Sequence, residues 1–228
     1  ANPSICEIER LGLLAADRVI AVSDHTRCRL VKQYGIDRGR VDVVHNATDR
    51  VVGVPFPALP TGARRRVLFM GRVTWQKGPE QFIRAAARLA AERDDIEFVM
   101  AGGGDLRPAM VELADELGLG GRVVFPGFVA VADVPDLLRS ADVFVMTSMA
   151  EPFGIVALEA AAQGVPVVLP ASAGVVEAMP QAVRYTGGDV EQLAVKIGRL
   201  LDNEALRQRA AQRQQERARR LTWRDAAA

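Results

Sequence analysis

Several residue types and sequence features are scarce or absent in this chain of 228 residues, and each absence excludes a kind of site or a class of protein. The two cysteines, Cys6 and Cys28, do not form a metal-ligand motif, and free thiols are favoured over a disulfide. No apolar run approaches the roughly 18 residues that a membrane-crossing helix needs. Residues 1–10 have neither the basic start nor the apolar stretch of a signal peptide. We therefore expect a cytoplasmic protein.

Lysine is also rare, because Lys32, Lys77 and Lys196 are the only lysines and the other 26 of the 29 Lys and Arg residues are arginine. The formal net charge is +1, so overall charge gives no reason to expect a nucleic-acid partner. The arginine-rich residues 207–224 could form a helix on a membrane surface, but the apolar face of such a helix is thin. A solvated helix is therefore favoured.

The abundant feature is a set of short apolar runs that alternate with helical patterns. These runs are rich in β-branched residues and lack polar alternation, which is typical of strands buried on both faces. Repetition of strand, helix and strand predicts an α/β fold with parallel sheets and right-handed crossovers. The predicted strands are Val19–Val22, Val41–Val44, Val67–Met70, Phe98–Ala101, Val123–Phe125, Val143–Met146 and Val165–Leu169.

A break in this alternation falls at residues 51–66, which contain three prolines and two glycines and show no helical period. We interpret this stretch as an inter-domain linker. It separates residues 1–50, with two short strand–helix units, from residues 67–228, with a longer series of five strands. The chain reads as helical after Asp189, and residues 204–220 are expected to form a largely solvated helix.

Glycine and charge directly follow three of the predicted strands. In open parallel sheets, ligands bind beyond the carboxyl ends of the strands, so these segments are expected to share one rim. Their coincidence indicates a binding site more strongly than any one of them alone. The three segments are Gly71–Gly78, Gly102–Asp105 and Thr147–Gly154.

Two cations in the first segment, Arg72 and Lys77, are candidates to hold a diphosphate. Arginine offers planar, forked donors and lysine a mobile point charge, although a solvated loop remains the alternative for Arg72. In the second segment, Gly103 and Gly104 would let the backbone approach a ligand, or would simply form a tight turn. The first unit has no GxGxxG sequence, so the dinucleotide fingerprint is absent.

The segment from Glu151 to Glu159 carries the strongest signal. It leads through a turn into an apolar helix, and the first amides of that helix, on Gly154, Ile155 and Val156, are expected to attract phosphate. Glu151 can accept hydrogen bonds from sugar hydroxyls. Glu159 lies within the apolar helix, where a carboxylate is costly unless it is paired or reaches a cleft. A ribose diol or an arginine would satisfy it.

This segment resembles the E-x7-E signature of a large family of retaining GT-B glycosyltransferases, known as family 4 or group 1. Residues 71–78 resemble the diphosphate clamp of that family, and residues 101–105 and 125–128 resemble its later loops. Residues 16–23 and 44–49 resemble the last two strands of its acceptor-binding domain. The resemblance covers nearly the whole chain and is strongest to glycogen-synthase-like glucosyltransferases.

The resemblance implies a Rossmann-like nucleotide-sugar-binding domain at residues 67–228, flanked by helices, and a remnant of the acceptor-binding domain at residues 1–50. It implies a nucleotide diphosphate sugar as donor, with UDP-glucose or ADP-glucose expected. Family members retain the anomeric configuration by a front-side mechanism in which the leaving phosphate helps to deprotonate the acceptor. The protein then stabilises charge on the diphosphate, and neither a metal nor another cofactor is expected.

The same resemblance assigns roles to the candidate residues. Arg72 and Lys77 would hold the phosphates, while Glu151 would contact the sugar. Glu159 would bind the ribose. The catalytic candidates are therefore Arg72, Lys77 and Glu151, and the donor-binding candidates are Gly71, Gly103, Gly104, Gly154, Ile155, Val156 and Glu159.

The chain also departs from the family pattern, because it starts at what would be the final helices of the acceptor-binding domain. Neither His25 nor His45 matches the histidine that family members place near the transferred sugar. We therefore expect a chain that binds donor but transfers little sugar alone. The acceptor is not specified and could be a glucan, another saccharide, a lipid-linked molecule or a small molecule.

Two rival functions remain. The first is a non-catalytic nucleotide-sugar-binding module or truncated pseudo-enzyme, although the intact charged residues argue against a decayed donor site. The second is a GT-B epimerase or phosphorylase, which is disfavoured because neither the epimerase acids nor the cofactor lysine of a phosphorylase is recognisable.

Overall fold

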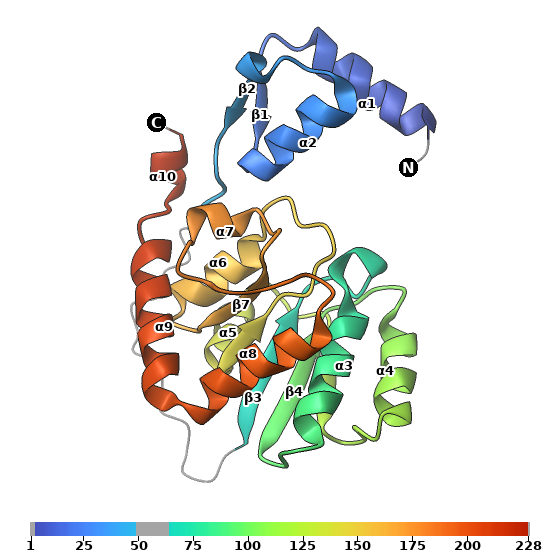
Figure 1. Cartoon of the computed structure of the whole chain (residues 1–228), viewed down its shortest axis with the longest axis vertical. Coiled ribbons are helices and arrows are strands. Elements are labelled where there is room, and N and C mark those ends of the chain that lie inside the picture. Colours follow the sequence, from blue (N-terminus) through green and yellow to red (C-terminus); the bar gives the residue numbers. More distant parts are fainter. Residues whose placement is uncertain (1–2, 49–63, 228) are drawn as a thin grey trace.

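The computed structural model describes residues 3–48 and 64–227, and this part of the chain forms two parallel β-sheets (Figure 1). The larger sheet has the strand order β5-β4-β3-β6-β7-β8, with every neighbouring pair parallel. Counted from β3, this is the doubly wound order of Rossmann-like folds. Its strands are β3 Arg65–Met70, β4 Ile96–Ala101, β5 Val123–Gly127, β6 Val143–Val145, β7 Val167–Pro170 and β8 Val183–Tyr185.

Helices cover both faces of the larger sheet. The helical elements are the 3₁₀ turn η2 Trp75–Lys77 and the helices α3 Pro79–Ala90, α4 Arg107–Glu116, α5 Val134–Arg139, α6 Ile155–Ala162, α7 Val175–Ala178, α8 Val190–Asp202, α9 Glu204–Ala218 and α10 Trp223–Ala226. Side chains alternate along β3, so Val67 and Phe69 pack beneath α3, α4 and α8. Leu68 packs on the opposite face with α5 and α6.

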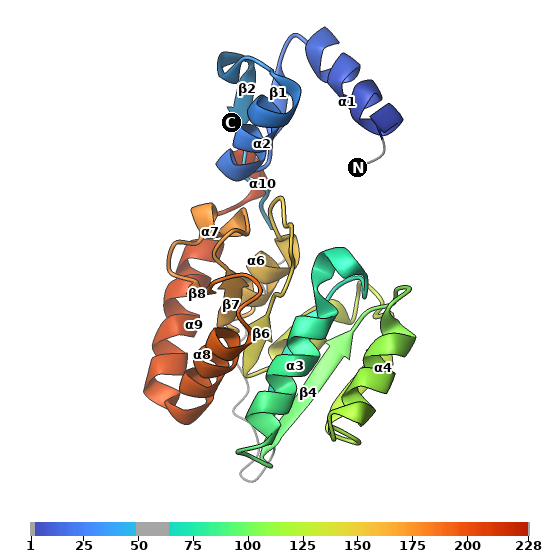
Figure 2. The ribbon, with the colours of Figure 1, turned by 45° about the vertical axis from the view of Figure 1, so that its right-hand side comes forward.

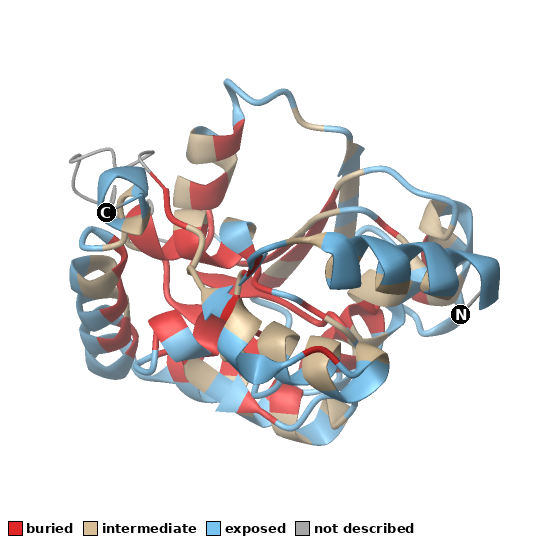
Figure 3. Ribbon diagram, turned by 90° about the horizontal axis from the view of Figure 1, so that it is seen from above, coloured by how far each residue is buried: buried red, intermediate tan, exposed pale blue. Residues whose placement is uncertain are grey.

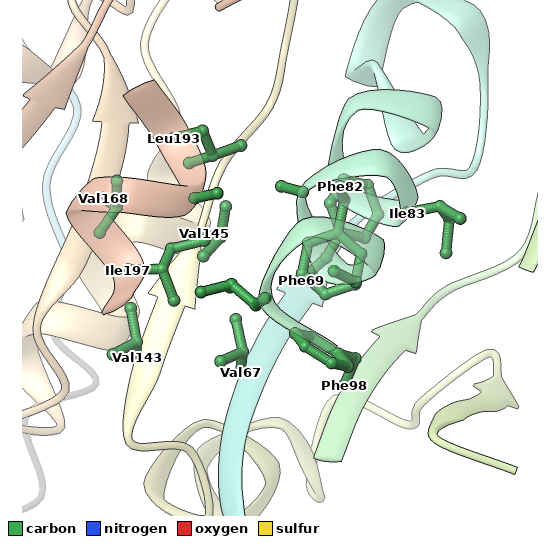
Figure 4. Close-up of a cluster of buried hydrophobic side chains, with 14 of the residues drawn as sticks. Val67, Phe69, Phe82, Ile83, Phe98, Val143, Val145, Val168, Leu193 and Ile197 are labelled. Carbon is green, nitrogen blue, oxygen red and sulfur yellow. The ribbon is translucent and has the colours of Figure 1, made fainter. Parts of the chain in front are cut away.

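The core beneath α3 and α8 contains an aromatic cluster. Figure 4 shows Phe69, Phe82 and Phe98 together, with Leu193 and Ile197 of α8 reaching the same layer. The ring centroid of Phe82 lies 5.7 Å from that of Phe69 and 6.3 Å from that of Phe98, in the tilted and edge-on arrangements that aromatic rings prefer. This packing fixes α3 on the sheet.

Residues 3–48 form a smaller unit beyond the carboxyl ends of the larger sheet (Figure 1). Its two strands are parallel, and its described core consists of Val19, Ala21, Ile36 and Val41. The polypeptide returns to this unit, because the amide of Thr48 donates to the carbonyl of Leu221, and α10 lies next to it in Figures 1 and 2. Its elements are α1 Pro3–Ala15, β1 Val19–Ala21, α2 Asp24–Tyr34, the 3₁₀ turn η1 Arg38–Arg40 and β2 Val41–Val43.

The α/β prediction is confirmed, and all seven predicted strands are present with small differences at their ends. The central strands are buried on both faces, as Figure 3 shows. Burial on both faces is wrong for β5, which lies at an edge and exposes Val124. The prediction of five strands in this region missed β8, a three-residue strand whose Arg184 is exposed.

The prediction of a largely solvated helix over residues 204–220 is wrong for one face of α9. That face is buried against α6 and α8. Gln214 is fully buried, where its side-chain oxygen accepts from the amide of Val167 at 2.8 Å and its side-chain nitrogen donates to the carbonyl of Gln181 at 3.3 Å. A glutamine satisfied in this way can be buried without large apolar neighbours.

The predicted linker at residues 51–66 falls mostly outside the described residues, which resume at residue 64. Its last two residues, Arg65 and Arg66, belong to β3 and pair with Ile96 and Glu97 of β4. The larger sheet therefore begins two residues before the predicted boundary at residue 67.

Candidate functional site

The strand order opens a crevice between β3 and β6. From these neighbours the chain continues to opposite faces of the sheet, through α3 and α6 respectively. Doubly wound folds bind ligands at this switch point, beyond the carboxyl ends of the strands. A pocket of about 190 Å³ lies there. It is lined by Phe69, Met70, Gly71, Lys77, Val134, Phe144, Val145, Met146, Ser148, Glu151, Val156 and Glu159.

The polar centre of the pocket is an ion pair between two loops. The Nζ of Lys77 lies 2.6 Å from Oε2 of Glu151, and the Oγ of Ser148 donates to the same oxygen at 2.9 Å. The Glu151 side chain is only 7% exposed and that of Lys77 23%. A carboxylate this buried is tolerated because it is paired and hydrogen-bonded. The two charged candidates of the sequence thus lie side by side.

Tight loop packing delivers Lys77 to this position. The Oγ1 of Thr147 donates to the carbonyl of Lys77 at 2.9 Å, and the amide of Met149 donates to the carbonyl of Gln76 at 2.9 Å. Gly78 has a left-handed φ of 60°, and a Cβ there would lie 2.2 Å from the carbonyl oxygen of Thr147. Only glycine allows the two loops to approach so closely.

The turn into α6 brings a helix N-terminus to the pocket. Gly154 has φ 111°, and a Cβ there would lie 2.7 Å from Cε of Met146. The amides of Gly154, Ile155 and Val156 donate to no acceptor among the residues that the structure describes. Such amides, with the helix dipole, favour an anion. Of these three residues, only Val156 lines the pocket.

The triple-glycine loop makes a close approach of a kind that the sequence did not reveal. A Cβ on Gly102 would lie 1.8 Å from the carbonyl oxygen of Gly71, and one on Gly104 would lie 2.2 Å from that of Val73. The amide of Val73 also donates to the carbonyl of Gly103 at 2.8 Å. These glycines therefore let the loops after β3 and β4 pack backbone against backbone.

The predicted site residues divide into two groups. Arg72 is exposed, and its side chain makes no hydrogen bond or ion pair with the part of the chain that the structure describes. It lies next to Gly71 at the rim without lining the pocket. The pocket brings together Gly71, Lys77, Glu151, Val156 and Glu159. The candidates outside its lining are Arg72, Gly103, Gly104, Gly154 and Ile155.

Sequence reasoning missed the role of Ser148 and the backbone contacts that fix residues 147–154, which we call the Glu151 loop. The carbonyls of Glu151 and Phe153 accept from the amides of Gly174 and Val175 at 3.1 and 2.8 Å. A serine three residues before an acid was the available signal for the first. The backbone contacts left no such signal, because they depend on the fold alone.

The smaller unit also contacts the Glu151 loop. The Oγ of Ser23, which is fully buried, donates to the carbonyl of Pro152 at 2.7 Å. A Cβ on Gly174 would lie 2.0 Å from that carbonyl oxygen and 2.8 Å from the Cβ of Ser23. Glycine at residue 174 therefore lets the smaller unit reach the Glu151 loop.

The carboxylate of Glu177 adds further contacts at this junction between the larger and the smaller unit. Glu177 of α7 accepts from the amides of Asp24 and His25, at the start of α2, at 2.7 and 2.8 Å. Its Oε2 also lies 3.2 Å from Nε2 of His45. Burial raises the pKa of Glu177, but the two amides and His45 outweigh that effect and hold the pKa below its ordinary value. Neither His25 nor His45 had a predicted role.

Residues 3–48 and 64–227 contain neither a candidate metal cluster nor a candidate membrane-spanning helix. No cluster of three or more His, Cys, Asp or Glu side chains there has an arrangement that could hold a metal ion. None of the helices in those residues is long and apolar enough to cross a membrane. The expectation that donor binding needs no metal remains a prediction.

Fold and site together define an α/β protein of the doubly wound class with a charged pocket at its switch point. The family model for glycosyl transferases group 1 matches residues 56–217, and the model for glycosyltransferase family 4 matches residues 4–51. The first match alone covers more than half of the chain, which therefore belongs to the glycosyl transferases group 1. This confirms the group 1 and family 4 membership that the resemblance implied.

Curated relatives agree with the family. The chain is 45% identical over 199 residues to an uncharacterized glycosyltransferase of Methanocaldococcus jannaschii, and the match covers 80% of this chain and 49% of that protein. It is 36% identical over 201 residues to the D-inositol 3-phosphate glycosyltransferase of Mycolicibacterium smegmatis, covering 83% and 46%. The chain thus spans about half the length of the curated relatives it matches.

Solved structures share the fold over nearly the whole chain. Sucrose-phosphate synthase from Thermosynechococcus elongatus superposes with a TM-score of 0.87 at 26% identity, covering 99% of this chain and 59% of that one. HepE of Anabaena, solved in complex with UDP and glucose, superposes with a TM-score of 0.85 at 23% identity, covering 97% and 64%. The Rossmann-like prediction is therefore confirmed.

Proposed function

We propose that the pocket between β3 and β6 binds the diphosphate and sugar of a nucleotide diphosphate sugar, and that the protein is a retaining glycosyltransferase. The observation that carries this proposal is the meeting of Lys77, Glu151 and the N-terminus of α6 in one pocket. UDP-glucose or ADP-glucose is the proposed donor. The structures of HepE with UDP and with UDP-glucose support the first of these.

The diphosphate is proposed to lie between Lys77 and the amides of Gly154, Ile155 and Val156. An ammonium can donate three hydrogen bonds, so Lys77 can contact a phosphate while it remains paired with Glu151. Arg72 lies at the rim, and its long side chain is proposed to turn inward and add a second cation. Gly103 and Gly104 then contribute by shaping the neighbouring loop.

The two acids are proposed to read the sugars. Glu151 accepts hydrogen bonds from hydroxyls of the transferred sugar, and Glu159, which also lines the pocket, accepts them from the ribose. As the sugar departs, negative charge grows on the diphosphate, where Lys77 and the helix N-terminus stabilise it. The acceptor hydroxyl attacks the anomeric carbon on the face from which the diphosphate departs, and the leaving phosphate takes the hydroxyl proton, so the anomeric configuration is retained. The cations and amides make a metal unnecessary in this proposal.

The span of the chain, about half that of its curated relatives, supports a division of labour. We propose that these residues bind donor in the cytoplasm but transfer little sugar alone, to a saccharide, lipid-linked or small-molecule acceptor. Neither a nucleic acid nor a membrane surface is a proposed partner. A non-catalytic nucleotide-sugar-binding module is the alternative. It predicts donor binding without transfer even when the chain is extended to the length of its relatives.

Calorimetric titration with UDP, ADP, GDP and the corresponding glucose esters tests donor binding. Lys77→Met should weaken the preferred nucleotide roughly 10- to 100-fold, because a hydrogen bond to a charged group contributes about 1.5–3 kcal/mol. Lys32→Met, which removes an exposed lysine from α2, is the matched control and should change nothing. Absence of binding by every nucleotide and ester would refute the proposal.

A further inference from the structure

The Glu151 carboxylate has two donors on one oxygen, and they differ in origin. Both the ammonium of Lys77 and the hydroxyl of Ser148 reach Oε2, whereas Oε1 accepts no hydrogen bond from the residues that the structure describes. Ser148 lies in the same loop as Glu151, three residues earlier, and is only 4% exposed. Lys77 comes from the loop after β3. The hydroxyl therefore belongs to the same loop as the acid, whereas the ammonium comes from a different loop.

We propose that Ser148 is a positioning residue that fixes Glu151 for the sugar, an inference that rests on the proposed function. Lys77 serves two anions in that function, the carboxylate and the diphosphate. When its ammonium is shared with the diphosphate, this buried carboxylate loses part of its charge compensation. The Ser148 hydroxyl keeps Oε2 occupied and the carboxylate oriented. Oε1 then remains the acceptor for a sugar hydroxyl.

A purely structural role for Ser148 predicts something different. If the hydroxyl only stabilised the loop between β6 and α6, its loss would weaken the pocket for the nucleotide and for the nucleotide sugar alike. If it positions Glu151, its loss falls on the sugar alone, because Glu151 is not assigned to the phosphates. The ratio of the dissociation constants for UDP and UDP-glucose separates the two.

The test titrates the chain and three variants with UDP and UDP-glucose, or with ADP and ADP-glucose if those bind instead. Ser148→Ala should weaken the sugar ester about 10-fold and change the affinity for the nucleotide less than twofold. Ser148→Cys, which keeps a weaker donor, should fall between. Ser140→Ala, which removes a hydroxyl that donates to the carbonyl of Leu137 at the far end of α5, should match the original chain.

The outcomes separate this inference from the function beneath it. If the unaltered chain binds no nucleotide or ester, the proposed function fails. If it binds them and Ser148→Ala weakens both equally, or neither, the positioning role is wrong. If Ser148→Ala does not fold, as circular dichroism would show, Ser148→Cys decides. An unchanged ratio in that folded variant, with its weakened donor, would overturn the inference.

Discussion

The two sheets of this chain follow the same parallel plan but differ in what holds them together. The larger sheet lies between two apolar layers, each with buried side chains from several strands and helices. The described core of the smaller sheet is Val19, Ala21, Ile36 and Val41, with α1 contributing no buried residue. What it lacks in apolar burial is partly replaced by polar contacts to α7 and to the Glu151 loop.

This difference shows where rigidity is needed. The loops that carry Lys77 and Glu151 start from β3 and β6, the central strands of the larger sheet, and are fixed by backbone contacts. The smaller unit approaches the same Glu151 loop from outside through Ser23. The larger sheet should therefore keep the pocket in shape by its own packing, with the smaller unit adjusting it.

The largest expected effect separates the two cores. Phe82→Ala removes a ring that is 1% exposed and should cost about 3–5 kcal/mol, while Ile36→Ala in the smaller core should cost about 2 kcal/mol, because a small core relaxes more easily. Amide hydrogen exchange checks this prediction. Phe82→Ala should lower protection throughout β3–β8, and Ile36→Ala should lower it in β1 and β2 alone.

Equal loss of protection in both sheets after Ile36→Ala would contradict this separation, since the two sheets would then unfold as one cooperative unit. Urea denaturation of the same two variants gives the free energies of unfolding.

The next effect concerns the junction. Gly174→Ala places a Cβ 2.0 Å from the carbonyl oxygen of Pro152 and 2.8 Å from the Cβ of Ser23. The smaller unit and the Glu151 loop must therefore move away from residue 174. Overpacking of this kind typically costs about 1–3 kcal/mol. Protection of the Asp24 and His25 amides should fall. Gly187→Ala, where the nearest atom lies 3.7 Å from the added Cβ, is the control.

If Gly174→Ala left those amides as protected as in the original chain, the junction would be more deformable than its contacts indicate. The measurement also tests the link to the site, because nucleotide affinity should weaken in this variant and not in Gly187→Ala.

The sequence predicted the larger sheet well because its strands are buried on both faces and so are continuous apolar runs. It also placed Lys77 and Glu151 at one rim, since parallel strands end at the same edge. It could not predict the burial of Gln214, because partners distant in the chain satisfy that side chain. Nor could it show that Gly104 faces the Val73 carbonyl, because loop-to-loop distances follow from the three-dimensional structure.

The smallest expected effect is a pH dependence confined to the junction. The pKa of Glu177 is lowered below its ordinary value of 4.5 in the folded chain, because its bonds to the amides of Asp24 and His25 and to His45 outweigh the opposing effect of burial. A carboxylate with a lowered pKa binds its proton more readily when unfolded. Its contribution is therefore complete above pH 4.5 and is lost as the pH falls through the lowered pKa.

The contribution should be about 1 kcal/mol or less, as for other partly exposed ionic contacts, so a local probe is needed. The NMR signals of the Asp24 and His25 amides should titrate together with a midpoint below 4.5. Glu177→Gln should abolish that titration while β3–β8 remain protected. A common acid transition of both sheets in the original chain would instead show that the junction binds them too tightly to respond alone.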